Sequence, residues 1–217
     1  MRNNMRSFLV LLFLAAQAVS GAAYAQSDVG LVNLVSGNVA FIPRVGQPGK
    51  VRNFMKVREG DRFQLSQGAQ MRIVFYEGSR QERWQGPASF RAGRSEAIAV
   101  QGSATEVQAL PVHVPQRMAR LPDLIQHARL GGVQVRGTGP ARRPGAESLA
   151  DARGTYQLLR TRLGPDDITA ELYLFSALYD HELYEEMAPL VDEMQKKQPG
   201  AEEVRSLAAW LRGRRSK

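Results

Sequence analysis

The stretch Met71-Arg72-Ile73-Val74-Phe75-Tyr76, followed by Glu77-Gly78-Ser79, decides the fold of this 217-residue chain. Its first six residues include the β-branched and aromatic types that favour strands, and the Glu-Gly-Ser that follows is typical of a turn. No segment after residue 25 has a higher apolar content. We therefore expect a central strand of a β-sheet here.

Other short strands are expected on both sides of this segment. Gly30–Val35 and Asn38–Ile42 are apolar runs separated by Ser36-Gly37, a natural hairpin turn because glycine tolerates positive φ. Further runs bounded by Gly, Ser or Pro predict strands at Phe63–Leu65, Arg80–Gln85, Ala88–Phe90, Ala97–Val100 and Glu106–Ala109. Many short strands with frequent turns favour an antiparallel β-sandwich or open barrel over a parallel sheet.

Beyond residue 146 the pattern changes to longer segments rich in Ala, Leu and Glu. Apolar residues three or four apart predict a first helix that Gly164-Pro165 ends and a second that Asp166 or Asp167 caps. A third helix is expected after Asp180-His181 and a fourth after Pro199-Gly200. The fold class is therefore multidomain, β then α, with a small α-hairpin unit after the sandwich.

The first residues are typical of a secretory signal peptide. Arg2 and Arg6 precede an apolar run from Phe8 to Ala16, and Ala23-Tyr24-Ala25 offers small residues for cleavage after Ala25. The run is shorter than the about 20 residues that span a bilayer. The expected product is periplasmic or secreted. The domain boundaries that follow are a signal peptide at 1–25, a β-domain at 26–130, a linker rich in Gly, Pro and Arg at 131–146, and a helical unit with a basic tail at 147–217.

The charges are numerous and unevenly distributed. The chain has a net charge of +8, of which Arg2 and Arg6 contribute two, and this surplus suits an anionic neighbour such as a cell-wall polymer, lipid head groups or an acidic protein. Nine acidic residues and no Lys or Arg lie between Asp166 and Glu193. This acidic segment could dock on the basic β-domain or on a basic partner, or it could be a solvated helix face.

The sequence contains no thiol, metal-ligand or nucleophile-elbow motif, whereas a carboxylate pair for glycoside hydrolysis needs only spatial proximity and leaves no motif. The chain has no cysteine, which excludes thiol catalysis and thiolate metal sites. Its three histidines, His113, His127 and His181, lack a partner at metal-ligand spacing, and no serine has a nucleophile-elbow pattern. We therefore predict no catalytic residue, no metal ligand, no cofactor and no enzymatic activity.

Five residues are candidates for contact with a partner. Arg80, Arg83 and Trp84 place cations and an aromatic ring together on one expected hairpin, where the alternation of a strand could instead bury Trp84. An exported protein meets glycans, lipids and other proteins first, so we expect no nucleic acid partner. Tyr179 and Tyr184 are the candidates on the helical unit.

The order of the β motifs resembles the FecR family periplasmic β-domain. Four pieces carry the resemblance: Val35-Ser36-Gly37-Asn38-Val39, Val57-Arg58-Glu59-Gly60-Asp61-Arg62-Phe63, Gly68–Phe75 and Glu77-Gly78-Ser79. The helical segment is similar to a degenerate tetratricopeptide repeat, with plain α-hairpin packing as the alternative. The positions that match the repeat are Leu174, Leu178, Tyr184, Met187, Val191, Met194 and Pro199.

The resemblance to the FecR family implies a role in the bacterial cell envelope. Its best-known members regulate iron uptake through a cytoplasmic domain that binds a sigma factor, and only Met1–Ser7 precede the apolar run here. Exported relatives that carry peptidoglycan-binding or helical-repeat modules fit better. The expected function is a non-catalytic binding or scaffold protein, not integral to the membrane, whose partner is an envelope protein or peptidoglycan. The alternatives are a glycan-active or glycan-binding cell-wall enzyme and a structural subunit of a surface or secretion assembly.

Overall fold

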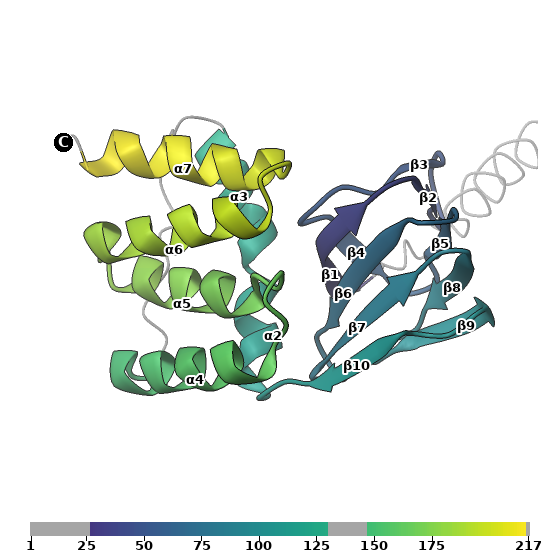
Figure 1. The fold of residues 1–217 in the computed structure, drawn as a ribbon, viewed down its shortest axis with the longest axis horizontal. Coiled ribbons are helices and arrows are strands. Elements are labelled where there is room, and N and C mark those ends of the chain that lie inside the picture. The colour runs from purple at the N-terminus through teal and green to yellow at the C-terminus, as the bar shows by residue number, and fades with distance from the viewer. Residues whose placement is uncertain (1–26, 130–146, 216–217) are drawn as a thin grey trace, which may run out of the picture.

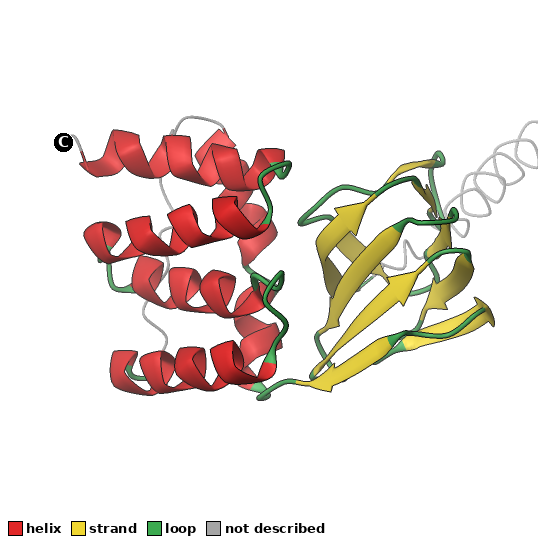
Figure 2. Cartoon of the chain, in the orientation of Figure 1, coloured by secondary structure: helices red, strands yellow, loops and turns green. Residues whose placement is uncertain are grey.

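The computed structural model describes residues 27–129 and 147–215. The predicted signal peptide, the predicted linker and the end of the basic tail lie outside the described residues. Two five-stranded antiparallel sheets form a sandwich, and helices follow them in the chain, as Figures 1 and 2 show. The expected β-then-α arrangement is confirmed, and the two sheets form an open sandwich and no closed barrel within these residues.

The sheet nearer the helices, which we call the central sheet, has the strand order β10-β7-β6-β1-β4. Its strands are β1 (Asp28–Ser36), β4 (Lys56–Arg58), β6 (Gln70–Phe75), β7 (Arg80–Gln85) and β10 (Glu106–Ala109). The other sheet, the outer sheet, has the order β3-β2-β5-β8-β9. Its strands are β2 (Val39–Ile42), β3 (Gly49–Lys50), β5 (Arg62–Leu65), β8 (Ala88–Ala92) and β9 (Ala97–Gln101).

The segment that decides the fold forms β6, the middle strand of the central sheet. It pairs with β1 on one side and β7 on the other, so the prediction of a central strand is confirmed. Met71, Ile73 and Phe75 belong to the core between the two sheets, whereas Val74 belongs to the core shared with the helices. Because successive side chains of a strand point to opposite faces, β6 is buried on both.

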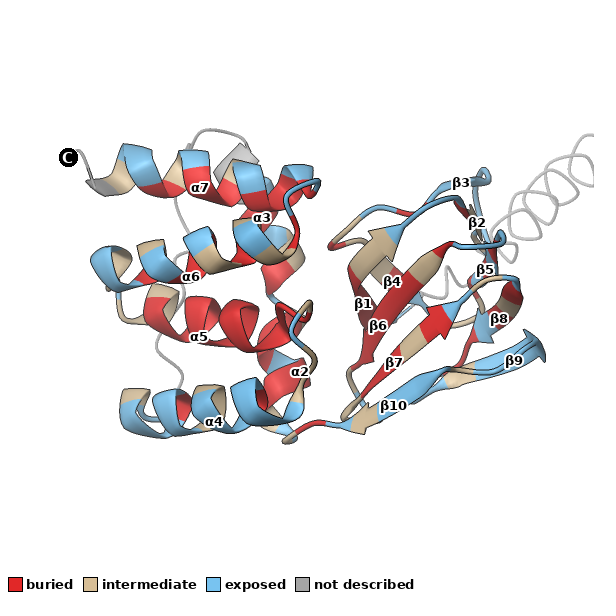
Figure 3. Cartoon of the chain, viewed as in Figure 1, coloured by how far each residue is buried: buried red, intermediate tan, exposed pale blue. Residues whose placement is uncertain are grey.

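The helices form the third layer. They are α2 (His113–Met118), α3 (Leu121–Arg129), α4 (Leu149–Arg162), α5 (Thr169–Asp180), α6 (Tyr184–Lys197) and α7 (Glu202–Arg215). Helices α4 to α7 pack in chain order, each against the next, while α2 contacts α5 and α3 contacts α7. Figure 3 shows α5 as the most buried helix, and every residue from Thr169 to Leu178 is buried.

Local sequence signals account for where these elements begin and end. Gly37 has a φ of 78° in the turn between β1 and β2, a conformation that glycine adopts without strain. Ser148 caps α4 by accepting a hydrogen bond from the Asp151 amide at 3.1 Å. Asp167 accepts one from the Thr169 amide at 2.8 Å, but the N-cap of α5 is Ile168, which has no side-chain cap, so the predicted aspartate cap lies one residue before the N-cap.

Four elements are absent from the sequence-based prediction. Strands β3 and β4 are two and three residues long, too short to show any alternation. Helices α2 and α3 lie within residues that we assigned to the β-domain, but they pack on the helical layer. Each helix has a proline in its first turn, Pro115 in α2 and Pro122 in α3, and in a sequence these prolines suggest a loop. Within the described residues no helix is long and apolar enough to cross a membrane.

Candidate binding surfaces

The three candidates on β7 belong to different faces of the central sheet. Trp84 is only 2% exposed; its Nε1 donates to Glu82 Oε2 at 3.0 Å, and its ring lies 4.4 Å from that of Phe90 between centroids. The sequence left two positions open for Trp84, one on the surface and one in the core, and the structure shows the core position. A buried ring cannot take part in a surface stacking platform.

Arg80 and Arg83 are held by partners within the chain. Arg80 forms ion pairs with Glu82 at 2.9 Å and Glu96 at 2.7 Å, close to the edge of the sandwich. Arg83 instead donates to Gln70 at 3.0 Å and lies 3.5 Å from Asp166 of the helical layer. Their guanidinium groups hold strands and layers together and do not converge on one site.

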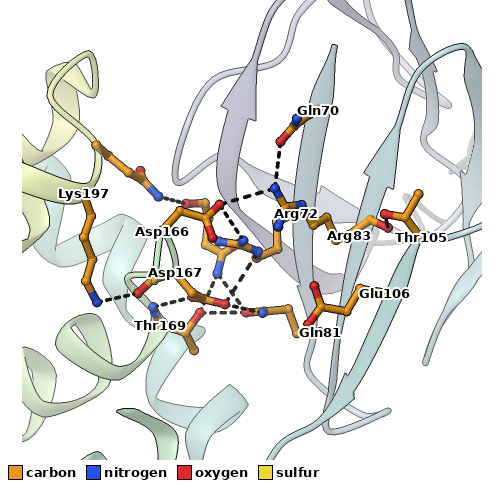
Figure 4. Close-up of polar contacts among 12 residues, drawn as sticks. Gln70, Arg72, Gln81, Arg83, Thr105, Glu106, Asp166, Asp167, Thr169 and Lys197 are labelled. Atoms are coloured by element: carbon orange, nitrogen blue, oxygen red, sulfur yellow. Dashed lines mark hydrogen bonds and ion pairs between the residues drawn. The ribbon is translucent and has the colours of Figure 1, made fainter. Parts of the chain in front are cut away.

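A buried polar network joins the central sheet to the helices (Figure 4). Arg72 on β6 reaches the turn before α5, where its Nη2 donates to Asp166 Oδ2 at 3.1 Å. Gln81 donates to Asp167 Oδ2 at 2.5 Å, and the Thr169 hydroxyl donates to Gln81 Oε1 at 2.7 Å. Buried polar groups of this kind are satisfied only in one geometry, so the network defines how the layers dock.

This network explains part of the acidic segment. Asp166 and Asp167 dock on Arg72 and Arg83, and Glu171 is buried beneath Arg160, so three of the nine acids are neutralised inside the chain. Asp180, Glu186 and Glu193 also pair with basic side chains, in this case of the helical layer itself. Docking on the β-domain, one of the three predicted roles, is therefore observed for Asp166 and Asp167 only.

A second ionic cluster ties α2 to α4 and α5. Glu147 Oε2 accepts from Arg117 Nε at 3.3 Å and also accepts the hydroxyl proton of Tyr173. His113 Nε2 lies 3.2 Å from Glu147 Oε1. Burial, together with the neighbouring Glu147 carboxylate, raises the pKa of Tyr173 well above its ordinary value. His113 Nε2 also lies 3.1 Å from the Thr155 hydroxyl, so these groups satisfy one another.

The hollow at the α4–α5 turn has a volume of about 340 Å³. Arg160 and Lys197 line it, and both contact the same buried Glu171 oxygen, at 2.6 and 3.0 Å. Glu193 also lines the hollow and lies 3.6 Å from Arg160, so two carboxylates balance the two cations and the hollow does not form a cradle for an anion. Within the described part of the chain, no group of three or more acidic or histidine side chains could hold a metal ion.

The two tyrosine candidates, unlike those on β7, lie together. Tyr179 and Tyr184 flank Trp210 of α7, with ring centroids 5.8 and 6.0 Å from its ring. Arg214 lies over the rings of Trp210 and Tyr184, with its Cζ 5.6 and 5.9 Å from their centroids. We call these four partly exposed residues the aromatic cluster. Burial raises the pKa of Tyr184.

The aromatic cluster is at the end of the helical layer that lies away from the sandwich. Helix α5 begins beside the central sheet, where Thr169 bonds Asn33 at 2.6 Å. Tyr179 is ten residues further along α5, which corresponds to about 15 Å. Figure 1 shows that α7 also runs away from the sandwich, and that its C-terminal end lies on the side of the helical layer far from the strands.

Sequence reasoning missed Trp210 and Arg214 of this cluster, and Asn33, Arg72 and Gln81 of the interface. A signal exists for Arg72 and Asn33, because each is a polar residue inside an apolar strand and so marks a second buried face. No protein-family model, curated protein or solved structure matches this chain.

Proposed function

We propose that this chain is a non-catalytic, exported binding or scaffold protein of the bacterial cell envelope. In this proposal a FecR-like β-sandwich is joined to a helical layer with one degenerate tetratricopeptide-like repeat, and the aromatic cluster contacts a protein partner. The signal-peptide pattern of residues 1–25 and the order of the β motifs support the location and the family.

The aromatic cluster is the observation that carries the binding role. Partly exposed Tyr and Trp side chains with a neighbouring Arg are the residue types most enriched where protein partners are bound. An aromatic cluster used only for packing does not need a cation over two of its rings.

Site-specific crosslinking in the native envelope tests this proposal. A photoreactive phenylalanine analogue replaces Tyr184, and the matched control carries the same analogue at Leu158, a residue of α4 that is 38% exposed. A discrete protein adduct is expected from position 184 and none from position 158. Arg214→Gln, which removes the cation and leaves the rings, should reduce the yield of that adduct.

The opposite result separates the alternatives. If position 184 gives no protein adduct while the chain remains in the cell-wall fraction, the protein-binding role is wrong and a glycan-binding protein becomes the better proposal. If Arg214→Gln leaves the adduct unchanged, the aromatic cluster is not the contact. Circular dichroism of each variant establishes that the helices are intact.

A further inference from the structure

The outward face of the outer sheet has an unusual pattern of side chains. Phe63, Leu65 and Phe90 point into the sandwich and are at most 2% exposed. The alternating neighbours of these residues, Arg62 and Arg91, therefore point outward, and both are exposed. The central sheet lies between the helices and the outer sheet, so this face is turned away from the helices.

Strand register places four of these outward side chains in one row across the sheet. Ile42 pairs with Arg62, Arg62 with Arg91, and Arg91 with Ile98. Two arginines are thus direct cross-strand neighbours, with Cβ atoms about 5 Å apart, and like charges in this arrangement destabilise a sheet. Unlike Arg72, Arg80 and Arg83, neither has an ion pair with any residue of the described ranges.

No carboxylate occupies an outward position in the neighbouring row. That row, read across the sheet, consists of Lys50, Ala40, Gln64, Ser89 and Gln101. The exposed Arg44 follows β2 and donates its backbone amide to Asp61 at the end where the arginine pair lies. The face therefore has a concentrated positive charge, and among the described residues no carboxylate forms an ion pair with Lys50, Arg62 or Arg91.

Exposed aliphatic side chains border this charge. Ile42 and Ile98, at the two ends of the row, are 42% and 45% exposed. Val45 in the loop after β2 and Val100 on β9 are 73% and 74% exposed. A soluble polyanion would have no favourable contact for these side chains, whereas the boundary between lipid head groups and acyl chains does.

We propose that the outward face of the outer sheet docks on an anionic phospholipid surface. Lys50, Arg62 and Arg91 contact the phosphates, and the aliphatic side chains at the margins enter the interface, as Arg and Lys side chains with apolar neighbours do at membrane surfaces. Such a contact would neutralise the Arg62–Arg91 pair. It leaves the aromatic cluster on the opposite side of the molecule free, and it does not depend on the protein partner proposed above.

Vesicle flotation tests this inference with the full chain. Vesicles of phosphatidylglycerol mixed with phosphatidylcholine should bind the protein more strongly than vesicles of phosphatidylcholine alone, and this difference should shrink as salt is raised. Arg62→Gln with Arg91→Gln should lower the partition coefficient about 30-fold, since each cation contributes about fivefold at an anionic surface. Arg153→Gln with Lys196→Gln removes the same charge from the helices and should have little effect.

The aliphatic residues distinguish a membrane from a polymer. Ile42→Ser with Ile98→Ser should weaken binding to the anionic vesicles but leave binding to soluble dextran sulfate unchanged. All variants share the same residues 1–25, so any contribution of that apolar stretch cancels in the comparison. Absence of binding to anionic vesicles would overturn the proposal, as would equal losses in the arginine and helix variants. If the serine variant binds vesicles normally, the face is a site for an anionic polymer instead.

Discussion

Arg72 of β6 and Asp167 of the turn before α5 form an ion pair with both side chains 2% exposed, and their Nε and Oδ2 atoms lie 3.6 Å apart. The two residues belong to the segments that we expected to form separate units. Their charges are acceptable in the interior only because each has further hydrogen-bond partners, Asp166 for Arg72 and Gln81 for Asp167. The sandwich and the helices are therefore coupled by charges that cannot be removed one at a time without cost.

Removing one partner should weaken the whole fold. Arg72→Met leaves the Asp167 carboxylate buried without its cation, and we expect a loss of about 3 kcal/mol in the free energy of unfolding. Urea unfolding, followed by circular dichroism, measures this loss. A single transition that moves to lower urea would show that sheet and helices unfold together, whereas an unchanged midpoint would contradict the role of the pair.

The neighbouring carboxylate provides the matched control. Asp166 contacts the same guanidinium at 3.1 Å, but its side chain is 40% exposed, so water screens the interaction. Asp166→Asn should cost less than about 1 kcal/mol, and Asp167→Asn should cost clearly more. Equal effects of the two substitutions would mean that burial does not determine the strength of these contacts.

The sequence predicted most of the elements but not this interface, for a physical reason. The strand at Met71–Phe75 and the helix ends at Gly164-Pro165 and Pro199-Gly200 follow from local propensity, which adjacent residues determine. Arg72 and Asp166, by contrast, are 94 positions apart, and no local pattern says which buried polar residue meets which. What a polar residue within a buried strand does indicate is a second covered face.

The candidate sites, like the fold, could be predicted from the sequence only in part. Tyr179 and Tyr184 lie close in sequence and share the aromatic cluster, but Trp210 joins them only because α7 packs on α6. Trp84 shows the limit of composition as a guide. Its neighbours Arg80 and Arg83 suggest a surface platform, yet the alternation that points Glu82 inward also points Trp84 inward.

The turn between β6 and β7 should depend on Gly78. A side-chain carbon at this position would overlap the backbone oxygen of Ser95, which belongs to the loop before β9. We expect Gly78→Ala to lower the free energy of unfolding by about 1–3 kcal/mol. Thermal unfolding measures the change.

Substitution of Gly154 by alanine should have the opposite effect on stability. This glycine lies within α4, and a side-chain carbon there would meet no atom within 4 Å. Gly154→Ala should stabilise the protein by about 0.5–1 kcal/mol, because alanine loses less backbone entropy in a helix. A destabilised Gly154 variant, or an unaffected Gly78 variant, would contradict the backbone geometry described here.

The hydroxyl of Tyr76 should cost stability at neutral pH. It is buried against the helical core and has no hydrogen-bond partner within the described residues. Tyr76→Phe removes an unsatisfied polar group and keeps the ring, so we expect a gain of about 1 kcal/mol in chemical unfolding. A loss of similar size would show that the hydroxyl has a partner.

The same substitution should change the response to alkaline pH. Burial raises the pKa of Tyr76 above its ordinary value, so the unfolded chain loses this proton near pH 10 while the folded chain keeps it. The stability linked to this proton is complete below about pH 10 and is lost as pH rises above it. Tyr76→Phe should therefore make the decline above about pH 10 less steep. Tyr173, whose pKa is also raised, should retain part of the decline.

The two tryptophans of the chain should report separately on the core and on the aromatic cluster. Trp84 is 2% exposed, and Trp210 is partly exposed beside Arg214. In Trp210→Phe, the remaining Trp84 emission should be blue-shifted and resistant to acrylamide, because the sandwich excludes the quencher. In Trp84→Phe, the Trp210 emission should be quenched readily, and a protein partner that covers the cluster should protect it. Ready quenching of Trp84 would contradict the packing of the sandwich, and quenching of Trp210 that a bound partner does not alter would place that partner elsewhere on the chain.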